Sequence, residues 1–429
     1  MKLFERLFKH ITLAFLLCFF APTTASSPNN EPTLQADSIE ISLLTCGPRQ
    51  QVYSLYGHTA IRFQDKQTGR DIAINYGVFS FDKPFFVLRF VFGLTDYEMG
   101  IAPFDIFEWE YDPTGCGVRQ QVLNLTAQEK MAIAQAVDRN MEPQNRVYRY
   151  NFFYDNCTTR ARDIIANNLN GRIVYDTSTP QHLNTSTPQH HNTPAQYPTF
   201  RNLIHNYNET HRWARFGNDL LLGVKADYNT TFEQQQFLPE RLCADFERAH
   251  IISADGTKRN LVSSSFWLFE PTTKQQSTQQ TNMSILDVFS PLVTFSILSI
   301  LTLIIAIVEY RRKRIIWVFD TSIMLTTGAC GLLLFAMIFS QHPTVSLNLQ
   351  ILLLNPINIF MLYSVTKAAR QNRIHWWTKA WSALILLLLA GSFLQSYAEG
   401  ITIVALSLLL RNISNIYTFK NTGSKQTEA

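Results

Sequence analysis

The feature that most constrains this 429-residue chain is a series of long apolar segments confined to its last third. A helix rises about 1.5 Å per residue, so about 20 apolar residues cross the hydrocarbon core of a bilayer. Four of the segments are long enough to do so and a fifth is marginal. In order, with the marginal one last, they are residues 288–308, 315–340, 349–366, 376–394 and 400–410. The pattern predicts a membrane module with five spans.

The basic residues beside these segments predict how the module is oriented. Lys and Arg follow the first, third and fifth segments, whereas loops 341–348 and 395–399 carry none. Because cytoplasmic loops hold the excess of Lys and Arg, the loops without them should face outwards, together with the large N-terminal part. The formal net charge of +4 is therefore a topology signal, and it does not indicate a nucleic-acid partner. The basic residues are Arg311, Arg312, Lys313, Arg314, Lys367, Arg370, Arg373, Lys379, Arg411, Lys420 and Lys425.

The first 25 residues have the pattern of a secretory signal peptide. A basic start is followed by an apolar run over residues 11–21 and by small residues at 23–25. Two alternatives remain open: Cys18 could belong to a lipoprotein signal, and the segment could stay as an uncleaved anchor. In each case the residues that follow are exported, into a compartment where cysteines can oxidise.

Residues 34–270 are expected to form a soluble α+β domain. Alternating apolar residues predict strands at 39–44, 60–63 and 72–76. A helix should cover 126–141, since Thr126 and Glu129 have capping-box spacing. A further helix should begin near Cys157 and stop at Gly171.

Two segments interrupt or end this domain. Residues 177–192 repeat TSTPQHLN as TSTPQHHN, which favours a low-complexity surface insert over a metal site built from His182, His190 and His191. Residues 271–285 have the composition of a linker. The transmembrane domain is then expected over 286–413, and a cytoplasmic tail over 414–429.

The motif Tyr-Asp-Asn-Cys-Thr-Thr-Arg at 154–160 is the strongest chemical signal in the chain. A cysteine at a helix start meets unpaired N–H groups and the positive end of the helix dipole, and both favour its thiolate. Arg160 could add to this effect, and it is also a candidate for binding the oxyanion or the substrate. The same amides are natural oxyanion donors, with Tyr56, Asn156 and Thr158 as neighbouring candidates. A structural or bridged cysteine is the alternative interpretation of Cys157.

A histidine that could act as the base lies in the motif YGHTAIRF at 56–63. His58 follows a glycine in a short predicted strand, and the strand at 72–76 should pair with it as a hairpin. Asn75 is the residue expected to orient the imidazole, with Tyr76 as the alternative. A lone histidine in a strand is more often only a satisfied polar residue.

The order of these parts, a histidine strand pair before a cysteine helix, resembles the circularly permuted relatives of NlpC/P60 and papain-like enzymes. More closely, the chain resembles the Lnb family of bacterial lipoprotein N-acyltransferases. The resemblance is carried by segments 56–63, 75–82, 143–163, 216–223 and 346–360 and spans nearly all of the chain after the signal. It implies a permuted papain-like (NlpC/P60-like) periplasmic domain followed by an all-α five-helix transmembrane domain.

The resemblance also implies a reaction. Cys157 would be the acylated nucleophile and His58 its base, in an inner-membrane enzyme that moves a fatty acyl chain to the N-terminal amine of lipoproteins. Its substrates would be a phospholipid or a diacylglyceryl-lipoprotein, and no cofactor or metal is expected. Two other functions stay open: a periplasmic cysteine amidase or peptidase acting on cell-wall peptides, and a non-catalytic membrane scaffold.

Several further residues carry open expectations. Cys46 and Cys116 could form a disulfide, which would leave Cys157 and Cys243 free. The acidic aromatic run at 108–112 favours a solvated or interfacial strand over a cation site. Polar residues inside the spans should face other helices or a polar cavity, since they are costly in lipid, and Pro356 should kink the third span. These polar residues are Asp320, Asn355 and Asn358. His342 is expected to be an ordinary loop histidine rather than part of the active site.

Overall fold

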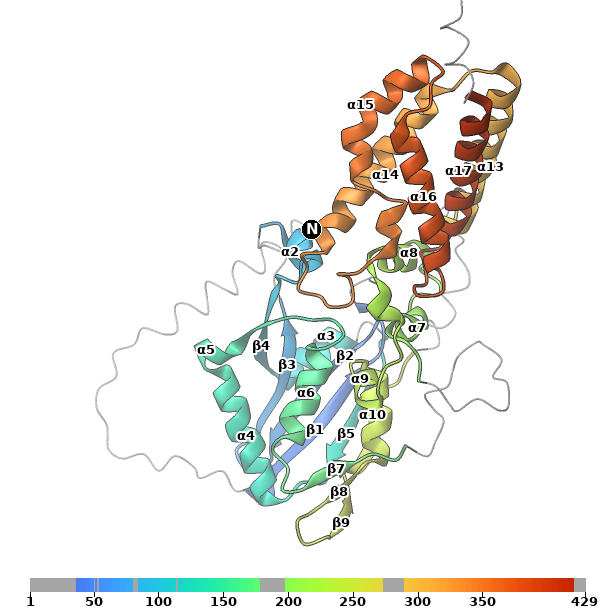
Figure 1. The fold of residues 1–429 in the computed structure, drawn as a ribbon. Coiled ribbons are helices and arrows are strands. Elements are labelled where there is room, and N and C mark those ends of the chain that lie inside the picture. The colour runs from blue at the N-terminus through green and yellow to red at the C-terminus, as the bar shows by residue number, and fades with distance from the viewer. Residues whose placement is uncertain are drawn as a thin grey trace, which may run out of the picture.

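The computed structural model describes residues 36–49, 51, 54–79, 84–112, 115–177, 197–272 and 289–419. Within them, a mixed α/β domain built around an antiparallel sheet stands against a C-terminal bundle of apolar helices (Figure 1). The predicted signal peptide, nearly all of the tandem repeat and most of the predicted linker lie outside the described residues.

A seven-stranded antiparallel sheet in the order β10-β5-β1-β2-β3-β4-β6 forms the frame of the described N-terminal domain. The strands predicted at 39–44, 60–63 and 72–76 are confirmed, and each is longer than predicted. The predicted hairpin is also confirmed, with Ala60 opposite Asn75. The strands are β1 (Ile39–Cys46), β2 (His58–Asp65), β3 (Arg70–Val78), β4 (Asp96–Pro103), β5 (Val118–Leu123), β6 (Val147–Arg149) and β10 (Val262–Phe269).

Helices cover both faces of this sheet, because successive strand residues point to opposite sides. Ile41 and Leu43 of β1 belong to a core with α4 (Ala127–Met141), α6 (Cys157–Ala166) and α10 (Pro239–Arg248), the three helices seen in front of the sheet in Figure 1. Leu44 and Cys46 belong to a second core with α3 (Phe104–Tyr111).

Helix α3 corrects one expectation, since the run at 108–112 is the end of a helix and not a strand. Phe104, Phe107 and Tyr111 are buried at helical spacing. The helical spacing begins at Phe104, before the run at 108–112, so the run taken alone does not reveal it.

The two predicted helices of the domain are confirmed, with one difference in length. Thr126 and Glu129 form the predicted capping box at the start of α4. Helix α6 begins at Cys157 as predicted, but it ends at Ala166, ahead of Gly171. The remaining elements of the domain are short: η1 (Ala36–Ser38), α2 (Phe86–Val91), α5 (Pro143–Arg146), β7 (Arg172–Val174), α7 (Phe200–His205), α8 (Arg212–Leu221), η4 (Val224–Asp227), α9 (Phe232–Gln235), β8 (His250–Ile252) and β9 (Lys258–Asn260).

The C-terminal module consists of apolar helices that match the predicted segments in order. Four helical segments of the described chain are long and apolar enough to cross a membrane, and α16 is shorter. The expectation that the last segment is the marginal one was therefore wrong, since α17 continues well beyond Leu410. The elements are α13 (Pro291–Arg312), α14 (Trp317–Met337), η5 (Leu349–Leu352), α15 (Ile357–Arg370), α16 (Trp376–Gly391) and α17 (Ile401–Phe419).

Asn358 and Asp320 bind neighbouring helices, as one of the two open interpretations predicted, whereas Asn355 accepts from the Ile357 amide of its own span. Asn358 is fully buried, where it donates to Thr327 Oγ1 and accepts from Trp377 Nε1, both at 2.8 Å. The third span is broken at Pro356, where η5 gives way to α15. This confirms the predicted distortion.

Arg411 corrects the topology argument, because it lies inside α17 and not in a loop. Its guanidinium pairs with Glu309 of α13 at 2.7 Å and with Asp320 of α14 at 2.7 Å. Asn415 also donates to Glu309. A charge neutralised in this way lets the helix continue where hydropathy alone predicts its end.

Helix α8 joins the two parts of the molecule. Phe216 packs against Phe295 of α13, and the backbone of α8 accepts hydrogen bonds from Asn348 and Gln350 of the bundle. Gly223, just beyond α8, donates to the carbonyl of Thr344 at 2.8 Å. The domain therefore rests on the loops at one end of the bundle, as Figure 1 shows.

Candidate active site

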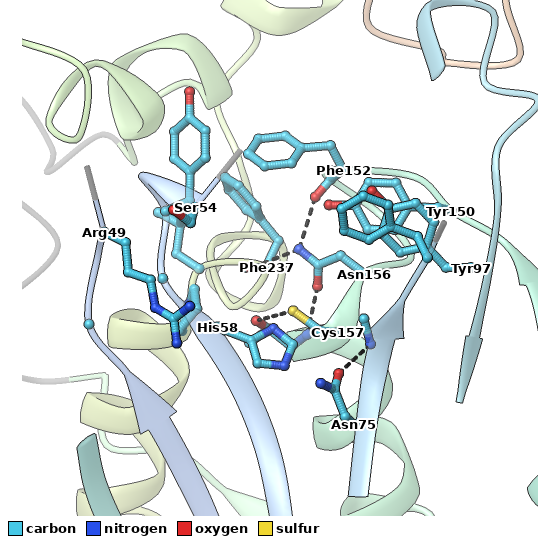
Figure 2. Close-up of a pocket in the computed structure, with 18 of the residues that line it drawn as sticks. Arg49, Ser54, His58, Asn75, Tyr97, Tyr150, Phe152, Asn156, Cys157 and Phe237 are labelled. Carbon is cyan, nitrogen blue, oxygen red and sulfur yellow. Dashed lines mark hydrogen bonds between the residues drawn. The ribbon is translucent and has the colours of Figure 1, made fainter. Parts of the chain in front are cut away.

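The site is built on the first turn of α6, where Cys157 is the first helical residue. Asn156 is the N-cap: its Oδ1 accepts from the amides of Thr158 and Thr159, both at 2.9 Å. Its Nδ2 donates to the carbonyls of Phe152 and Phe237, also at 2.9 Å. Every side-chain group of Asn156 is thus used to hold the helix start in place (Figure 2).

This cap decides which amide is left for chemistry. The first amides of a helix have no partner within the helix. Asn156 occupies those of Thr158 and Thr159, and the amide of Arg160 bonds the Asn156 carbonyl at 3.0 Å. The cap leaves the amide of Cys157 itself unused, beside its own sulfur. Asn156 is therefore a positioning residue, and the expectation that its side chain helps an oxyanion is not favoured by this geometry.

His58 is the first residue of β2, and it reaches the pocket because two glycines leave room. Gly57 has φ +76°, and a Cβ there would lie 2.5 Å from the carbonyl oxygen of Cys46. A Cβ on Gly77 would lie 2.8 Å from Cε1 of His58. The imidazole is consequently held between neighbouring strands, and its buried Nε2 has no hydrogen-bond partner among the described residues.

The thiol and the imidazole shift each other's acidity. Burial by itself would raise the pKa of Cys157, but nearby His58, the amide of Thr59 and the hydroxyl of Thr158 lower that pKa to about 7. Burial likewise disfavours a charged His58, yet the neighbouring Cys157 raises the pKa of the imidazole. Each residue thus stabilises the charged form of the other, as expected of a thiolate–imidazolium pair.

Asn75 lies beside His58, on the neighbouring strand β3. Its Oδ1 accepts from the Gly77 amide at 2.6 Å, a bond drawn in Figure 2. After burial and Cys157, Asn75 is a further influence on His58, and it raises the pKa of the imidazole. Tyr76, the alternative for this role, is buried, and its hydroxyl accepts from Asn140 instead.

The pocket around Cys157 has two chemically different sides. It encloses about 200 Å³, less than the roughly 300–1,000 Å³ of an ordinary ligand pocket. Figure 2 shows Arg49 and Ser54 on one flank of the Cys157–His58 pair and Tyr97 and Tyr150 on the other. Glu110 also lines the pocket, and Arg49 lies over the ring of Tyr111. The aromatic residues that line the pocket are Tyr56, Phe79, Tyr97, Tyr111, Tyr150, Phe152 and Phe237.

The other predicted site residues have different positions. Tyr56 lines the pocket, but its hydroxyl accepts from Asn218 of α8 at 2.9 Å. Thr158 also lines it, with Oγ1 3.8 Å from the sulfur of Cys157. Arg160 is not among the residues that line the described pocket: it binds Asp155 at 2.7 Å and stacks on Tyr148. Both contacts of Arg160 are structural, and this geometry does not favour the expected role in binding the oxyanion or the substrate.

The sequence did not single out Arg49, Glu110 or, apart from Tyr56, the aromatic residues that line the pocket. They come from separate loops and strands that only the fold brings together. A signal was present for one group, since Tyr148, Tyr150, Phe152 and Phe153 precede the cysteine motif at close spacing.

Two further expectations concern the other cysteines and a metal site. Cys46, Cys116 and Cys243 are buried, and the disulfide considered for Cys46 and Cys116 is not formed in this structure. The thiol of Cys116 donates to the Gly47 carbonyl at 2.9 Å. No group of residues able to hold a metal ion occurs in the described part of the chain, and the repeat histidines lie outside it.

A cysteine at a helix start facing a strand histidine, in a domain joined to a bundle of apolar helices, defines a membrane protein with a thiol–imidazole site. Residues 27–202 match the family model described as the Lnb N-terminal periplasmic domain, and residues 280–422 match that of the Lnb transmembrane domain. The chain belongs to the Lnb family. It is thus a membrane protein with a periplasmic domain, which contains both Cys157 and His58. No curated protein and no solved structure matches the chain.

Proposed function

We propose that this protein is a multi-pass inner-membrane acyltransferase that transfers a fatty acyl chain, through a thioester on Cys157, to the N-terminal amine of a lipoprotein. The observation that carries the proposal is the pairing of Cys157 with His58, which lowers the pKa of the thiol to about 7. Such a thiol is substantially ionised near neutral pH and is therefore a ready nucleophile.

In the first half of the reaction, the thiolate attacks the carbonyl carbon of an acyl ester. The negative charge that develops on the carbonyl oxygen is stabilised by the amide of Cys157. The C–O bond to the alcohol then breaks, and the leaving alkoxide takes a proton from the imidazolium of His58. The products are an acyl thioester on Cys157, a free alcohol and a neutral His58.

In the second half, the neutral amine of the lipoprotein attacks the thioester carbonyl. His58 accepts a proton from the attacking nitrogen, and the C–S bond breaks to restore the thiolate. The product is an amide. Asn75 supports both halves of the reaction, since it lies against the imidazole and favours its protonated form.

Three further features support the proposal. The histidine strands precede the cysteine helix, which is the chain order of a permuted papain-like enzyme. The aromatic side of the pocket suits an acyl chain better than a polar peptide. The bundle would hold the pocket at the outer face of the membrane, where lipids and lipoproteins meet.

The test is the acylation state of lipoproteins in cells with and without the protein. N-terminal mass spectrometry should find the amide-linked chain only when the wild-type protein is present. Cys157→Ser should insert into the membrane normally but should not restore the modification. Incubation of the purified protein with phospholipid should add an acyl mass to the Cys157 peptide, and hydroxylamine should remove it.

The same test separates the alternatives. Unmodified lipoproteins together with cleaved cell-wall peptides would identify the site as that of an amidase. Full restoration of the modification by Cys157→Ser would contradict a catalytic role of Cys157. The remaining alternative would then be a non-catalytic membrane scaffold.

A further inference from the structure

Helix α2 exposes an apolar surface beside the active-site pocket. Its segment carries Phe85, which is 76% exposed, Leu88, which is 51% exposed, and Phe90, which is 37% exposed. Leu94 follows and is also exposed. Apolar side chains gathered on one short segment are costly in water, and they mark a contact with a partner or a membrane.

The position of α2 indicates which of these it contacts. The amide of Gln341, in the loop after α14, donates to the Phe92 carbonyl at 3.0 Å, and His342 Nε2 lies 3.1 Å from the Phe90 carbonyl. His342 thus holds α2 against the end of a membrane-spanning helix. Phe339, two residues before Gln341, is 69% exposed. In Figure 1, α2 lies at the end of the sheet that faces the bundle.

A row of aromatic rings connects α2 with the pocket. Phe90 stacks on Tyr150 at 6.2 Å, Tyr150 on Tyr97 at 4.0 Å, and Tyr97 on Phe79 at 4.8 Å between ring centroids. Tyr97, Tyr150 and Phe79 line the pocket that contains Cys157. Burial raises the pKa of Tyr97 and that of Tyr150, so both phenols stay neutral. An uncharged aromatic surface therefore runs from α2 to the nucleophile.

The pocket is too small for a whole fatty acyl chain, so most of the chain must lie outside it. A cavity of about 200 Å³ holds the reacting carbonyl and a few methylenes but not a whole fatty chain. The rest of the chain must leave the pocket on a side where apolar contact replaces water. The opposite side is lined by Arg49 and Glu110, which form an ion pair at 3.5 Å. The aromatic side is the one that suits methylenes.

We propose that α2 and Leu94 insert into the outer leaflet of the membrane, and that the acyl chain of a bilayer lipid reaches Cys157 along Phe90, Tyr150 and Tyr97. The occupant of this surface is a lipid acyl chain, because the surface is continuous with the exposed side of the spanning helices. The route rests on the proposed function, whereas the insertion of α2 does not.

The first test measures the depth of α2 in a bilayer. The full-length protein carrying Leu88→Cys, with its native cysteines replaced by alanine or serine so that only residue 88 reacts, is labelled with a nitroxide and placed in nanodiscs of phosphatidylethanolamine and phosphatidylglycerol. Lys258→Cys is the control, on β9 at the end of the domain away from the bundle (Figure 1). We expect the label at 88 to be relaxed by oxygen and protected from a water-soluble nickel complex, with the reverse at 258. A label at 88 that is open to nickel, or protected from both reagents by protein contact, would overturn the proposal.

The second test measures the route. Thioester formation on Cys157 is compared for a long-chain phospholipid and a water-soluble butyryl ester. Phe90→Gln should lower the ratio of long-chain to short-chain rates by about tenfold, since it removes an aromatic contact with the chain. Phe266→Gln on β10, where an exposed phenylalanine is distant in sequence from the pocket residues, is the control and should leave the ratio unchanged. An unchanged ratio in Phe90→Gln would refute the route. A wild-type protein that forms no thioester with either ester or with a diacylglyceryl-lipopeptide contradicts the proposed function, while the depth measurement still decides whether α2 enters the leaflet.

Discussion

Gly77 of β3 lies directly against the ring of His58 in β2: a Cβ at residue 77 would be 2.8 Å from Cε1 and 3.4 Å from Nδ1 of the imidazole. The same Cβ would be 3.1 Å from Oδ1 of Asn75. Because Gly77 has no side chain, the imidazole can occupy the space beside it. A side chain at residue 77 would therefore displace the imidazole that lies beside Cys157.

The first prediction concerns this space. Gly77→Ala should displace the imidazole by a fraction of an ångström or more, because atoms in contact do not approach within 3.0 Å. Misplacement of a catalytic group by about 1 Å costs on the order of 100-fold in rate. We expect thioester formation on Cys157 to fall by about that factor while the far-ultraviolet circular dichroism spectrum is retained.

Gly217→Ala is the matched control for this variant. Gly217 lies within α8, and a Cβ there would meet no atom within 4 Å. Alanine should be neutral or stabilising by up to about 1 kcal/mol, since it is the better helix former. Equal loss of activity in both variants would contradict the role given to Gly77.

The second prediction is a pH profile for alkylation of Cys157. Only the thiolate reacts, and the pKa of Cys157 is lowered to about 7, against about 8.5 for an ordinary cysteine. The rate with iodoacetamide, followed on the Cys157 peptide by mass spectrometry, should therefore rise with pH and reach half its maximum near pH 7.

Removal of the imidazole reverses this shift. Burial raises the pKa of Cys157, and His58 is the largest influence that lowers it. In His58→Ala the imidazolium no longer lowers the pKa of Cys157, whereas burial still raises it. The midpoint of the alkylation profile should therefore move to higher pH, and the rate at pH 7 should fall. A midpoint that stays near pH 7 would show that the two residues are not coupled.

Cys157 and His58, which the sequence singled out, share one pocket in the structure, and they could be found from the sequence because their signals are local. A cysteine after an N-cap, and a histidine at the start of an alternating strand, can be recognised within a few residues. The sequence could not predict that Arg160 points away from the pocket. That outcome depends on Asp155, which pairs with the guanidinium, and on Tyr148, over whose ring it lies. Nor could it place Arg49 beside Glu110, since the two are brought together only by the sheet.

The membrane module shows the same distinction. Hydropathy located the apolar segments in order, and the kink at Pro356 followed from its ring. It failed at α17, where Arg411, Asn412 and Asn415 read as the end of a span. All three are buried by contacts with other helices. A hydropathy window has no information on such partners.

The third prediction concerns the cap of α6. Asn156→Ala removes two accepted and two donated hydrogen bonds in a buried position. We expect a loss of about 2 kcal/mol in the free energy of unfolding, which combines the loss of a cap with unpaired buried groups. The thiolate of Cys157 should also lose its fixed position, so alkylation at pH 7 should slow.

Thr126→Ala provides the comparison, because it removes the equivalent capping box from α4. It should cost about 1 kcal/mol in stability and leave the alkylation rate of Cys157 unchanged. Unfolding is followed by circular dichroism during thermal denaturation in detergent. If both variants slow alkylation equally, the effect of Asn156 is only one of general stability.

The fourth prediction concerns the buried charges between α13, α14 and α17. Arg411 is 2% exposed and pairs with both Glu309 and Asp320. Replacement of one member leaves the others buried without their partner, and this costs about 3–5 kcal/mol. Arg411→Met should therefore lower the temperature at which the bundle unfolds.

The replacement Arg312→Met tests whether the effect depends on burial. Arg312 ends α13 and is exposed, so its loss should leave the unfolding temperature in detergent nearly unchanged. The triple replacement Arg411→Met, Glu309→Gln and Asp320→Asn should recover much of the stability lost in Arg411→Met, because no unpaired charge then remains. If the triple variant is no more stable than the single one, the loss comes from the contact of the guanidinium with the ring of Phe319 and not from the unpaired carboxylates.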